Sequence, residues 1–352
     1  MPDPIVEHGR GAPGNPAGRF ERLAVVCEPV DDGDGEERPA RPTELFRDTS
    51  KSILTHNDSP DVPMDVTVNP YRGCEHGCIY CYARPYHEYL GLSAGVDFES
   101  RIFVKDQAPA LLREALTAKS WTPQLIGFSG VTDPYQPIER KLRLTRACLE
   151  VLVEFRNPVA IITKSHMVTR DIDLLRELAA HQAVQVMLSI TTLDDRLAGA
   201  MEPRASRPGR RLDAVRELSA AGIPTGVMVA PIIPGLTDHE VPAILKAAAD
   251  AGALTAGRTV VRLPHGVKDL FADWLAVHMP DRKDKVLNRL RAVRHGKLNE
   301  SAFGARMRGD GPFADAIHQS FELHRRRLGL TKKIVLSSDA FRRPEGPQGR
   351  LF

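Results

Sequence analysis

Short apolar runs rich in β-branched residues recur from about residue 64 onward, and amphipathic stretches separate most of them. The runs predict six strands, at 66–68, 125–128, 159–163, 184–190, 225–229 and 259–263. The stretches between them predict helices at 108–118, 140–155, 172–181, 211–221 and 242–251, because their apolar residues recur at helical spacing. Strands and helices that alternate in this way indicate an α/β protein with a parallel sheet and right-handed crossovers.

The number of strands leaves two architectures open. Six strands do not complete an eight-stranded barrel, so the pattern fits an incomplete barrel and a doubly wound sheet equally well. In either architecture the ligand site lies beyond the C-terminal ends of the strands. After residue 263 the strand signal fades, and the pattern predicts helices at 269–278, 282–294 and 313–328.

The chain therefore divides into three predicted parts. Residues 1–63 form an irregular N-terminal segment that we expect to be partly disordered, residues 64–265 form the core, and residues 266–352 form a basic, mainly helical C-terminal extension. Within the first part, residues 1–18 are rich in Gly and Pro and are expected to be mobile, residues 23–27 form a short apolar run, and residues 31–42 read as an acidic surface loop.

Composition and charge limit the classes of function. The 352 residues are 42% apolar and 26% charged, which is typical of a globular protein with a sizeable core. No apolar run approaches the roughly 18 residues of a membrane span. The N-terminus also lacks a signal peptide pattern, so we expect a cytoplasmic protein with no membrane partner. Residues 281–352 carry 17 Lys and Arg against 8 Asp and Glu, a balance of +9, whereas residues 1–280 carry 31 against 37, a balance of −6. This basic end makes a nucleic acid a candidate partner, although a solvated surface gives the same charge.

Three of the five cysteines lie within eight positions, in the segment NPYRGCEHGCIYCYAR at 69–84, directly after the first predicted strand. Cys74, Cys78 and Cys81 have the spacing Cys-x3-Cys-x2-Cys, and three thiolates in one loop can converge on one soft metal centre. A cubane iron–sulfur cluster normally takes four thiolates, so three would leave one iron free to bind another molecule. The alternative is structural zinc, with His76 or His87 completing a Cys3His site.

This loop resembles the radical S-adenosylmethionine (SAM) superfamily, in which an aromatic residue, here Tyr80, precedes the last cysteine. The segment at 69–84 and the string GVTDPYQPIE at 130–139 are similar to the branch related to spore photoproduct lyase, often described as DNA-repair-photolyase-like. The resemblance covers about residues 45 to 330. It implies a partial (β/α)6 TIM-like barrel in which Cys74, Cys78 and Cys81 bind a [4Fe-4S] cluster. The open iron of that cluster would bind SAM, which is cleaved reductively to a 5′-deoxyadenosyl radical that takes hydrogen from a substrate.

The resemblance also implies SAM contacts at the strand ends. The expected residues are Tyr80 near the adenine, Gly130 with Thr132 or Asp133 near the amino group, Ser189 and Thr191 near the ribose, and Lys164, Glu202 and Arg211 around the carboxylate and ribose. Simpler interpretations remain open for these positions. Asp133 can belong to a turn only, the hydroxyls of Ser189 and Thr191 can be solvated, and Arg211 can lie on the surface. Glu202 is expected either to orient Arg211 or to contact the ribose.

The predicted function is therefore a radical SAM enzyme that receives electrons from a reductase or from a flavodoxin- or ferredoxin-type donor. Its candidate substrates are DNA, through repair-type lyase chemistry, a peptide or a small metabolite. The alternative from another class is a non-catalytic zinc or iron–sulfur binding module. Spore photoproduct lyase uses an additional cysteine to return a hydrogen atom, and neither Cys27 nor Cys148 matches it, which counts against repair of that lesion. The string GRGAPG at 9–14 satisfies the pattern G-x-G-x-x-G but follows no strand, so we interpret it as a chance match.

Overall fold

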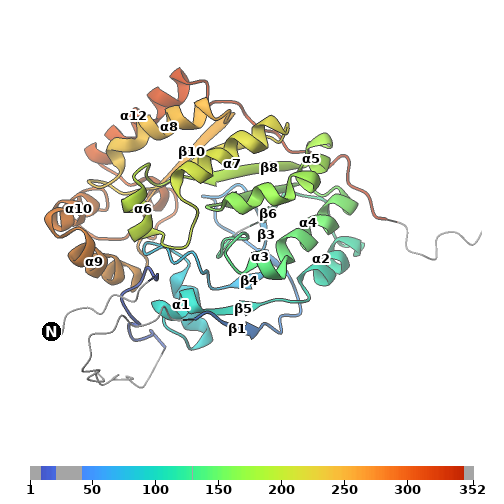
Figure 1. The fold of residues 1–352 in the computed structure, drawn as a ribbon, viewed down its shortest axis with the longest axis horizontal. Coiled ribbons are helices and arrows are strands. Elements are labelled where there is room, and N and C mark those ends of the chain that lie inside the picture. Colours follow the sequence, from blue (N-terminus) through green and yellow to red (C-terminus); the bar gives the residue numbers. More distant parts are fainter. Residues whose placement is uncertain (1–8, 21–41, 129, 345–352) are drawn as a thin grey trace, which may run out of the picture.

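The computed structural model describes residues 9–20, 42–128 and 130–344. Six parallel strands follow one another in chain order across one sheet, and a short strand pairs antiparallel at its edge (Figure 1). The parallel strands are β3 (Val66–Val68), β6 (Ile126–Phe128), β7 (Val159–Thr163), β8 (Val184–Ser189), β9 (Thr225–Ile232) and β10 (Thr255–Val260), and β2 (Leu54–His56) forms the edge. The strand β10 begins four residues before its predicted start, because its first residues include Gly257 and Arg258 and give no apolar run.

Helices connect each pair of successive strands. They include α2 (Ala108–Thr117), α3 (Glu139–Leu142), α4 (Leu144–Phe155), α5 (Ile172–Ala180), α6 (Asp195–Met201), α7 (Pro208–Ala220) and α8 (Val241–Asp250), with 3-10 turns η2 (His166–Asp171) and η3 (Asp238–Glu240). Proline lies in the first turn of α2, α7 and α8, where its missing N–H costs no hydrogen bond. Apolar side chains of α4, α5, α7 and α8 pack with those of the strands in one core.

The strand order decides between the two architectures that the sequence leaves open. A doubly wound sheet reverses its direction at a switch point, whereas this order runs one way from β3 to β10. Right-handed crossovers then place the connecting helices on one face, and Figure 1 shows α4, α5 and α7 in a row alongside the sheet. The fold is therefore the predicted partial barrel.

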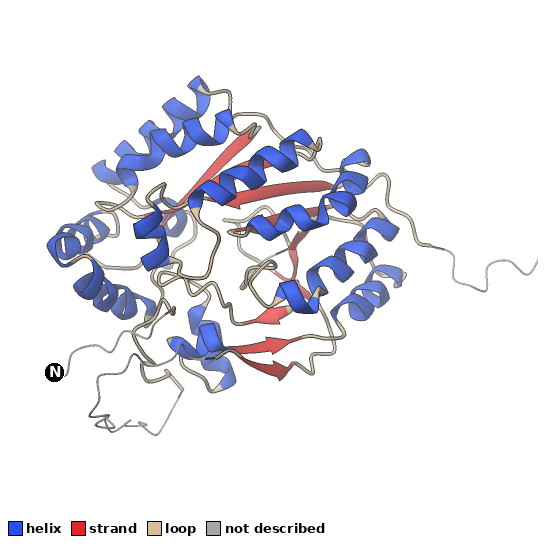
Figure 2. Ribbon diagram, in the orientation of Figure 1, coloured by secondary structure: helices blue, strands red, loops and turns tan. Residues whose placement is uncertain are grey.

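A second, smaller sheet lies beside the barrel and was not predicted. Its order is β1 (Glu44–Arg47), β5 (Arg101–Val104) and β4 (Tyr71–Arg72), and Figure 2 shows it apart from the barrel strands. The turn η1 (Arg84–Leu90) and the helix α1 (Val96–Ser100) precede β5. The strand β1 is exposed along its whole length and β4 has two residues, so neither gives a hydrophobic pattern in the sequence.

The predicted helical extension is present at the C-terminal end. It contains α9 (Val267–His278), α10 (Pro280–Ala292), α11 (Ala305–Arg308) and α12 (Pro312–Arg327). Apolar residues of α9 and α10 pack with Ile79 and Tyr80 of the cysteine loop, and α12 packs on α8. None of the described helices is both long and apolar enough to cross a bilayer.

The start of the described chain differs from the expectation of a mobile segment. Arg10, Gly11 and Ala12 are buried, and they contact the helix α1 through Glu99. The predicted apolar run at 23–27, nearly all of the acidic loop at 31–42, and Ser129 lie outside the described residues.

Candidate functional site

The cysteine loop begins directly after β4 and turns inward between the small sheet and the barrel. Gly73 and Gly77 adopt φ angles of 82° and 67°, a left-handed conformation that favours glycine. Cys74 and Cys78 are buried, and Cys81 is half-buried. Burial raises the pKa of Cys74, Cys78 and Cys81, and the negative charges that the neighbouring cysteines would carry raise the pKa of Cys74 and Cys78 further. The loop therefore gathers three thiols whose thiolate forms need a positively charged centre.

The histidines of this region do not complete a zinc site with the thiols. His76 Nδ1 lies 3.3 Å from Asp133 Oδ2, and the His87 Nε2–H donates to the carbonyl oxygen of Arg101 at 2.9 Å. Among the described residues, no three His, Cys, Asp or Glu side chains are placed to hold one metal ion. A cubane distributes its thiolates over different irons, so three thiols without a fourth protein ligand fit a [4Fe-4S] cluster better than zinc. Cys148 lies on α4 in the main core, as predicted.

The loop after β6 carries Gly130, Thr132 and Asp133. The side-chain oxygen of Asn69 accepts hydrogen bonds from the amides of Gly130 and Val131, at 2.9 and 3.1 Å. The Asp133 carboxylate accepts from Thr163 Oγ1 at 2.7 Å and from the amide of Lys164 at 2.8 Å. Burial acts to raise the pKa of Asp133, but the charge of His76 and these hydrogen bonds outweigh burial and lower it. Asp133 thus joins the cysteine loop, the β6 loop and the end of β7.

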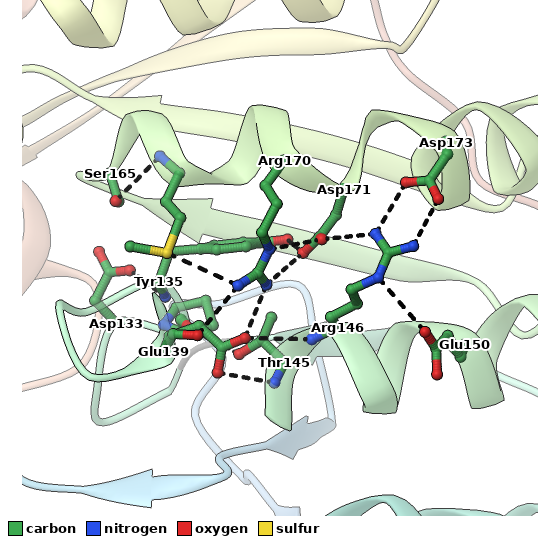
Figure 3. Close-up of polar contacts among 12 residues, drawn as sticks. Asp133, Tyr135, Glu139, Thr145, Arg146, Glu150, Ser165, Arg170, Asp171 and Asp173 are labelled. Carbon is green, nitrogen blue, oxygen red and sulfur yellow. Dashed lines mark hydrogen bonds and ion pairs between the residues drawn. The ribbon is translucent and has the colours of Figure 1, made fainter. Parts of the chain in front are cut away.

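The remaining residues of the GVTDPYQPIE string hold the cysteine loop in place through hydrogen bonds. Gln136 accepts a hydrogen bond from the Glu75 amide at 2.9 Å and donates to the carbonyl oxygen of Gly73 at 3.3 Å. Tyr135 donates to Asp171, and Glu139 accepts from Arg170 at 2.8 Å, within the network of buried carboxylates and arginines in Figure 3. The string therefore holds the cysteine loop against the barrel.

A buried polar cluster adjoins Cys78 at the ends of β7 and β8. The Glu202 carboxylate accepts hydrogen bonds from the hydroxyls of Tyr80 and Thr191 and forms an ion pair with Arg211. Arg211 is buried rather than on the surface, and it also donates to the carbonyl oxygens of Ser206 at 2.7 Å and Ser189 at 2.9 Å. Glu202 is thus placed to orient Arg211, which is one of the two alternatives predicted for it; its contact with a ribose stays a prediction.

Lys164 completes this cluster. Its Nζ donates to the carbonyl oxygen of Ala230 at 3.0 Å and lies 3.6 Å from Glu202 Oε1. The same ammonium lies 5.8 Å from the centre of the Tyr80 ring. Burial lowers the pKa of Lys164 to about 8. The charges of Glu202, Lys164 and Arg211 all act on the Cys78 thiol, so the cluster and the cysteine loop form one site.

The structure therefore brings the predicted residues to one side of the partial barrel. The side chains of Tyr80, Lys164, Thr191 and Arg211 all contact the Glu202 carboxylate, and the Ser189 carbonyl oxygen accepts a hydrogen bond from Arg211. Gly130, Thr132 and Asp133 lie on the neighbouring strand-end loop. Sequence reasoning missed the residues that position this set, namely Asn69, His76, Arg84, Glu99 and Gln136. All of these except Glu99 stand inside the two recognised strings, which was the available signal.

Comparisons with known proteins agree with this geometry. The profile of the family described as the Radical SAM superfamily matches residues 68–248. An uncharacterized protein of Mycobacterium tuberculosis is 34% identical over 280 residues, which cover 75% of this chain and 82% of the relative. A radical SAM Nα-GlyT isomerase of Pseudomonas phage M6 is 28% identical over 196 residues, covering 53% of this chain and 38% of the relative. The solved structure of spore photoproduct lyase complexed with dinucleoside spore photoproduct has a similar fold, with a TM-score of 0.57 at 16% identity, covering 81% of this chain and 79% of that chain.

Proposed function

The chain belongs to the radical SAM superfamily, and from this premise we propose that Cys74, Cys78 and Cys81 hold its iron–sulfur cluster. The cofactors of this enzyme are a [4Fe-4S] cluster and SAM. When bound, the reduced cluster supplies the electron that splits SAM into methionine and a 5′-deoxyadenosyl radical. The observation that carries the assignment is one loop that gathers three free thiols, of which Cys74 and Cys78 are buried and Cys81 is half-buried.

We further propose that the strand-end residues around the loop bind SAM. Lys164 supplies a buried positive charge beside Cys78 for the carboxylate of SAM. Glu202, Thr191 and Tyr80 supply the oxygen atoms that a ribose and its hydroxyls can bind. Each of the three side-chain nitrogens of Arg211 donates a hydrogen bond within the chain, and from this we propose that Arg211 acts through Glu202 as a positioning residue. Asp133 likewise positions Gly130 and Thr132 for the amino group of SAM.

The substrate that we propose is a nucleic acid. Two features support this: the balance of +9 over residues 281–352, and the similarity of the fold to a lyase that was solved in complex with a dinucleoside photoproduct. The enzyme also needs a one-electron donor, for which we propose a reductase or a flavodoxin- or ferredoxin-type protein.

Reconstitution with iron and sulfide under anaerobic conditions tests the cluster assignment. We expect a brown protein with about four irons per chain that releases 5′-deoxyadenosine when it is mixed with dithionite and SAM. Cys78→Ala should lose both the iron and the release. Cys148→Ala is the matched control, because it removes a buried thiol from the core and not from the loop. If wild type releases no more 5′-deoxyadenosine than Cys78→Ala, the proposal is wrong.

A further inference from the structure

Three exposed tyrosines lie immediately beyond the cysteine loop. Tyr82 follows Cys81, and Tyr86 and Tyr89 lie in η1; their exposed fractions are 46%, 53% and 67%. With Arg19, Arg262 and His265 they line a cavity of about 180 Å³. None of the described residues that line this cavity is acidic. Large aromatic side chains that stay exposed around a basic cavity indicate a binding surface.

Arg262 is a cation of this cavity that forms no ion pair with a carboxylate of the described residues. It lies two residues beyond β10, at the strand ends where barrel enzymes bind their ligands. Among the described residues Arg262 has no ion pair, and its buried Nε has no hydrogen-bond partner. The nearby carboxylate of Asp61 is already bound by Arg306. A partly buried cation left in this state is costly unless an anion binds to it.

The contacts that hold the three tyrosine rings in place leave each side chain exposed to solvent. The guanidinium carbon of Arg262 lies 5.3 Å from the centre of the Tyr82 ring, and the Tyr82 hydroxyl donates to the carbonyl oxygen of Gly130 at 2.7 Å. The Tyr86 and Tyr89 rings lie 6.4 Å apart, and Arg19 lies 5.8 Å from the Tyr89 ring. The hydrogen bond to Gly130 joins this surface directly to the loop on which we place SAM.

We infer that Tyr82, Tyr86, Tyr89, Arg19 and Arg262, called here the tyrosine–arginine patch, bind a nucleotide of a single-stranded or locally unpaired nucleic acid. A base stacks on the tyrosines, and a phosphate binds Arg262. The cavity is smaller than the roughly 300–1,000 Å³ of pockets that enclose whole small molecules, so it suits one planar group of a longer chain. Paired bases in a duplex present no free ring face, which excludes them from this surface. The inference rests on the proposed function and specifies its substrate.

Fluorescence anisotropy of a labelled oligothymidylate, measured with the reconstituted full chain, tests the inference. We expect the single strand to bind at least tenfold more tightly than its duplex with oligoadenylate. The double variant Tyr86→Ala/Tyr89→Ala should weaken single-strand binding about tenfold or more, because stacking is lost. Arg262→Gln should reduce the slope of log K against log salt by about 0.7, the value for one phosphate contact. Phe313→Ala is the matched control, because Arg289 covers this half-exposed ring on α12, away from the patch.

The outcomes separate the inference from the proposed function. If wild type releases 5′-deoxyadenosine but binds the single strand no better than the double variant does, the inference is wrong and the proposed function stands. Equal weakening by Phe313→Ala would assign binding to the basic C-terminal helices and would also overturn the inference. Equal affinity of wild type for the single strand and for the duplex would also overturn the inference. A wild type that binds the oligonucleotide but releases no 5′-deoxyadenosine would instead contradict the proposed function.

Discussion

Gly11 lies so close to Gly77 that a β-carbon at residue 11 would stand 1.7 Å from the Gly77 carbonyl oxygen. The Gly11 and Ala12 amides donate to the Glu99 carboxylate at 2.8 Å, and Arg10 donates to the Glu99 carbonyl oxygen at 2.7 Å. Residues 10–12 therefore cover the turn between Cys74 and Cys78. Their glycine is required for close backbone approach to the cysteine loop.

Gly11→Ala should push this segment off the cysteine loop. We expect a loss of about 1–3 kcal/mol in the free energy of unfolding, which is typical of overpacking at a buried position. The cluster should also lose its visible absorbance several-fold faster in air, because the loop is less covered. Gly14→Ala is the control, since a β-carbon at residue 14 meets no atom within 4 Å. Equal cluster lifetimes in the two variants would contradict the covering role.

Glu99→Gln should destabilise the same region through a buried ion pair. Glu99 and Arg84 are both fully buried and paired, and Arg84 also donates to the carbonyl oxygens of Gly77 and Cys78. Removing one charge of a buried pair typically costs about 3–5 kcal/mol, because the other charge is left unpaired. Chemical unfolding followed by circular dichroism measures this loss. Asp213→Asn, which breaks exposed pairs with Arg210 and Arg216, should leave the free energy of unfolding close to that of wild type.

The apolar pattern predicted the alternating strands and helices because each of them buries one regular face, whereas the partial barrel was implied by the resemblance and not by this pattern. The strand β7, with Val159, Ile161 and Thr163 buried, shows the alternation clearly, and the cysteine spacing located the cluster loop. The small sheet escaped prediction because β1 and β4 are stabilised by pairing with β5 and not by burial of a periodic face.

The contacts between distant segments also escaped prediction. The string GRGAPG was interpreted as a chance match, yet Gly11 packs on Gly77, which lies 66 residues further along the chain. No periodicity encodes such a contact, because it depends on where the carboxylate of Glu99 lies after folding. The hydrogen bonds of Arg211 and Asp133 within the chain also depend on the fold. Their residue types predicted contacts with SAM, which stay predictions, whereas the bonds of Arg211 to Ser189 and of Asp133 to Thr163 and Lys164 had no signal in the sequence.

His87 should make the stability of the fold depend on pH. Burial lowers the pKa of His87 from 6.5 to about 4, and its ring packs edge-on against Phe98. Between these two pKa values the unfolded chain binds a proton that the folded chain does not, so stability falls as the pH falls below about 6.5. Acidification from about pH 7.5 to 5.5 should therefore remove about 1 kcal/mol through this group alone.

Unfolding of wild type and of His87→Phe at the two pH values isolates this effect. The variant is less stable at neutral pH because it loses the hydrogen bond to the Arg101 carbonyl oxygen, but it has no proton to gain on acidification. Its loss of stability between the two pH values should be smaller than that of wild type by about 1 kcal/mol. Parallel pH profiles would contradict this, because they would show that folding does not lower the pKa of His87.

Asp133→Ala should weaken SAM binding about tenfold, or about 1.4 kcal/mol, as measured by equilibrium dialysis with the reconstituted protein. The reason is that the loop of Gly130 and Thr132 loses its anchor on Thr163 and on the Lys164 amide. Asp173→Ala, which removes an exposed partner of Arg146, should leave the affinity unchanged. Thr163→Val separates positioning from direct contact, because it removes only the 2.7 Å hydrogen bond to Asp133. If Asp133 positions the loop through Thr163, Thr163→Val weakens SAM binding in the same direction as Asp133→Ala, whereas wild-type affinity in Thr163→Val would contradict positioning through this hydrogen bond.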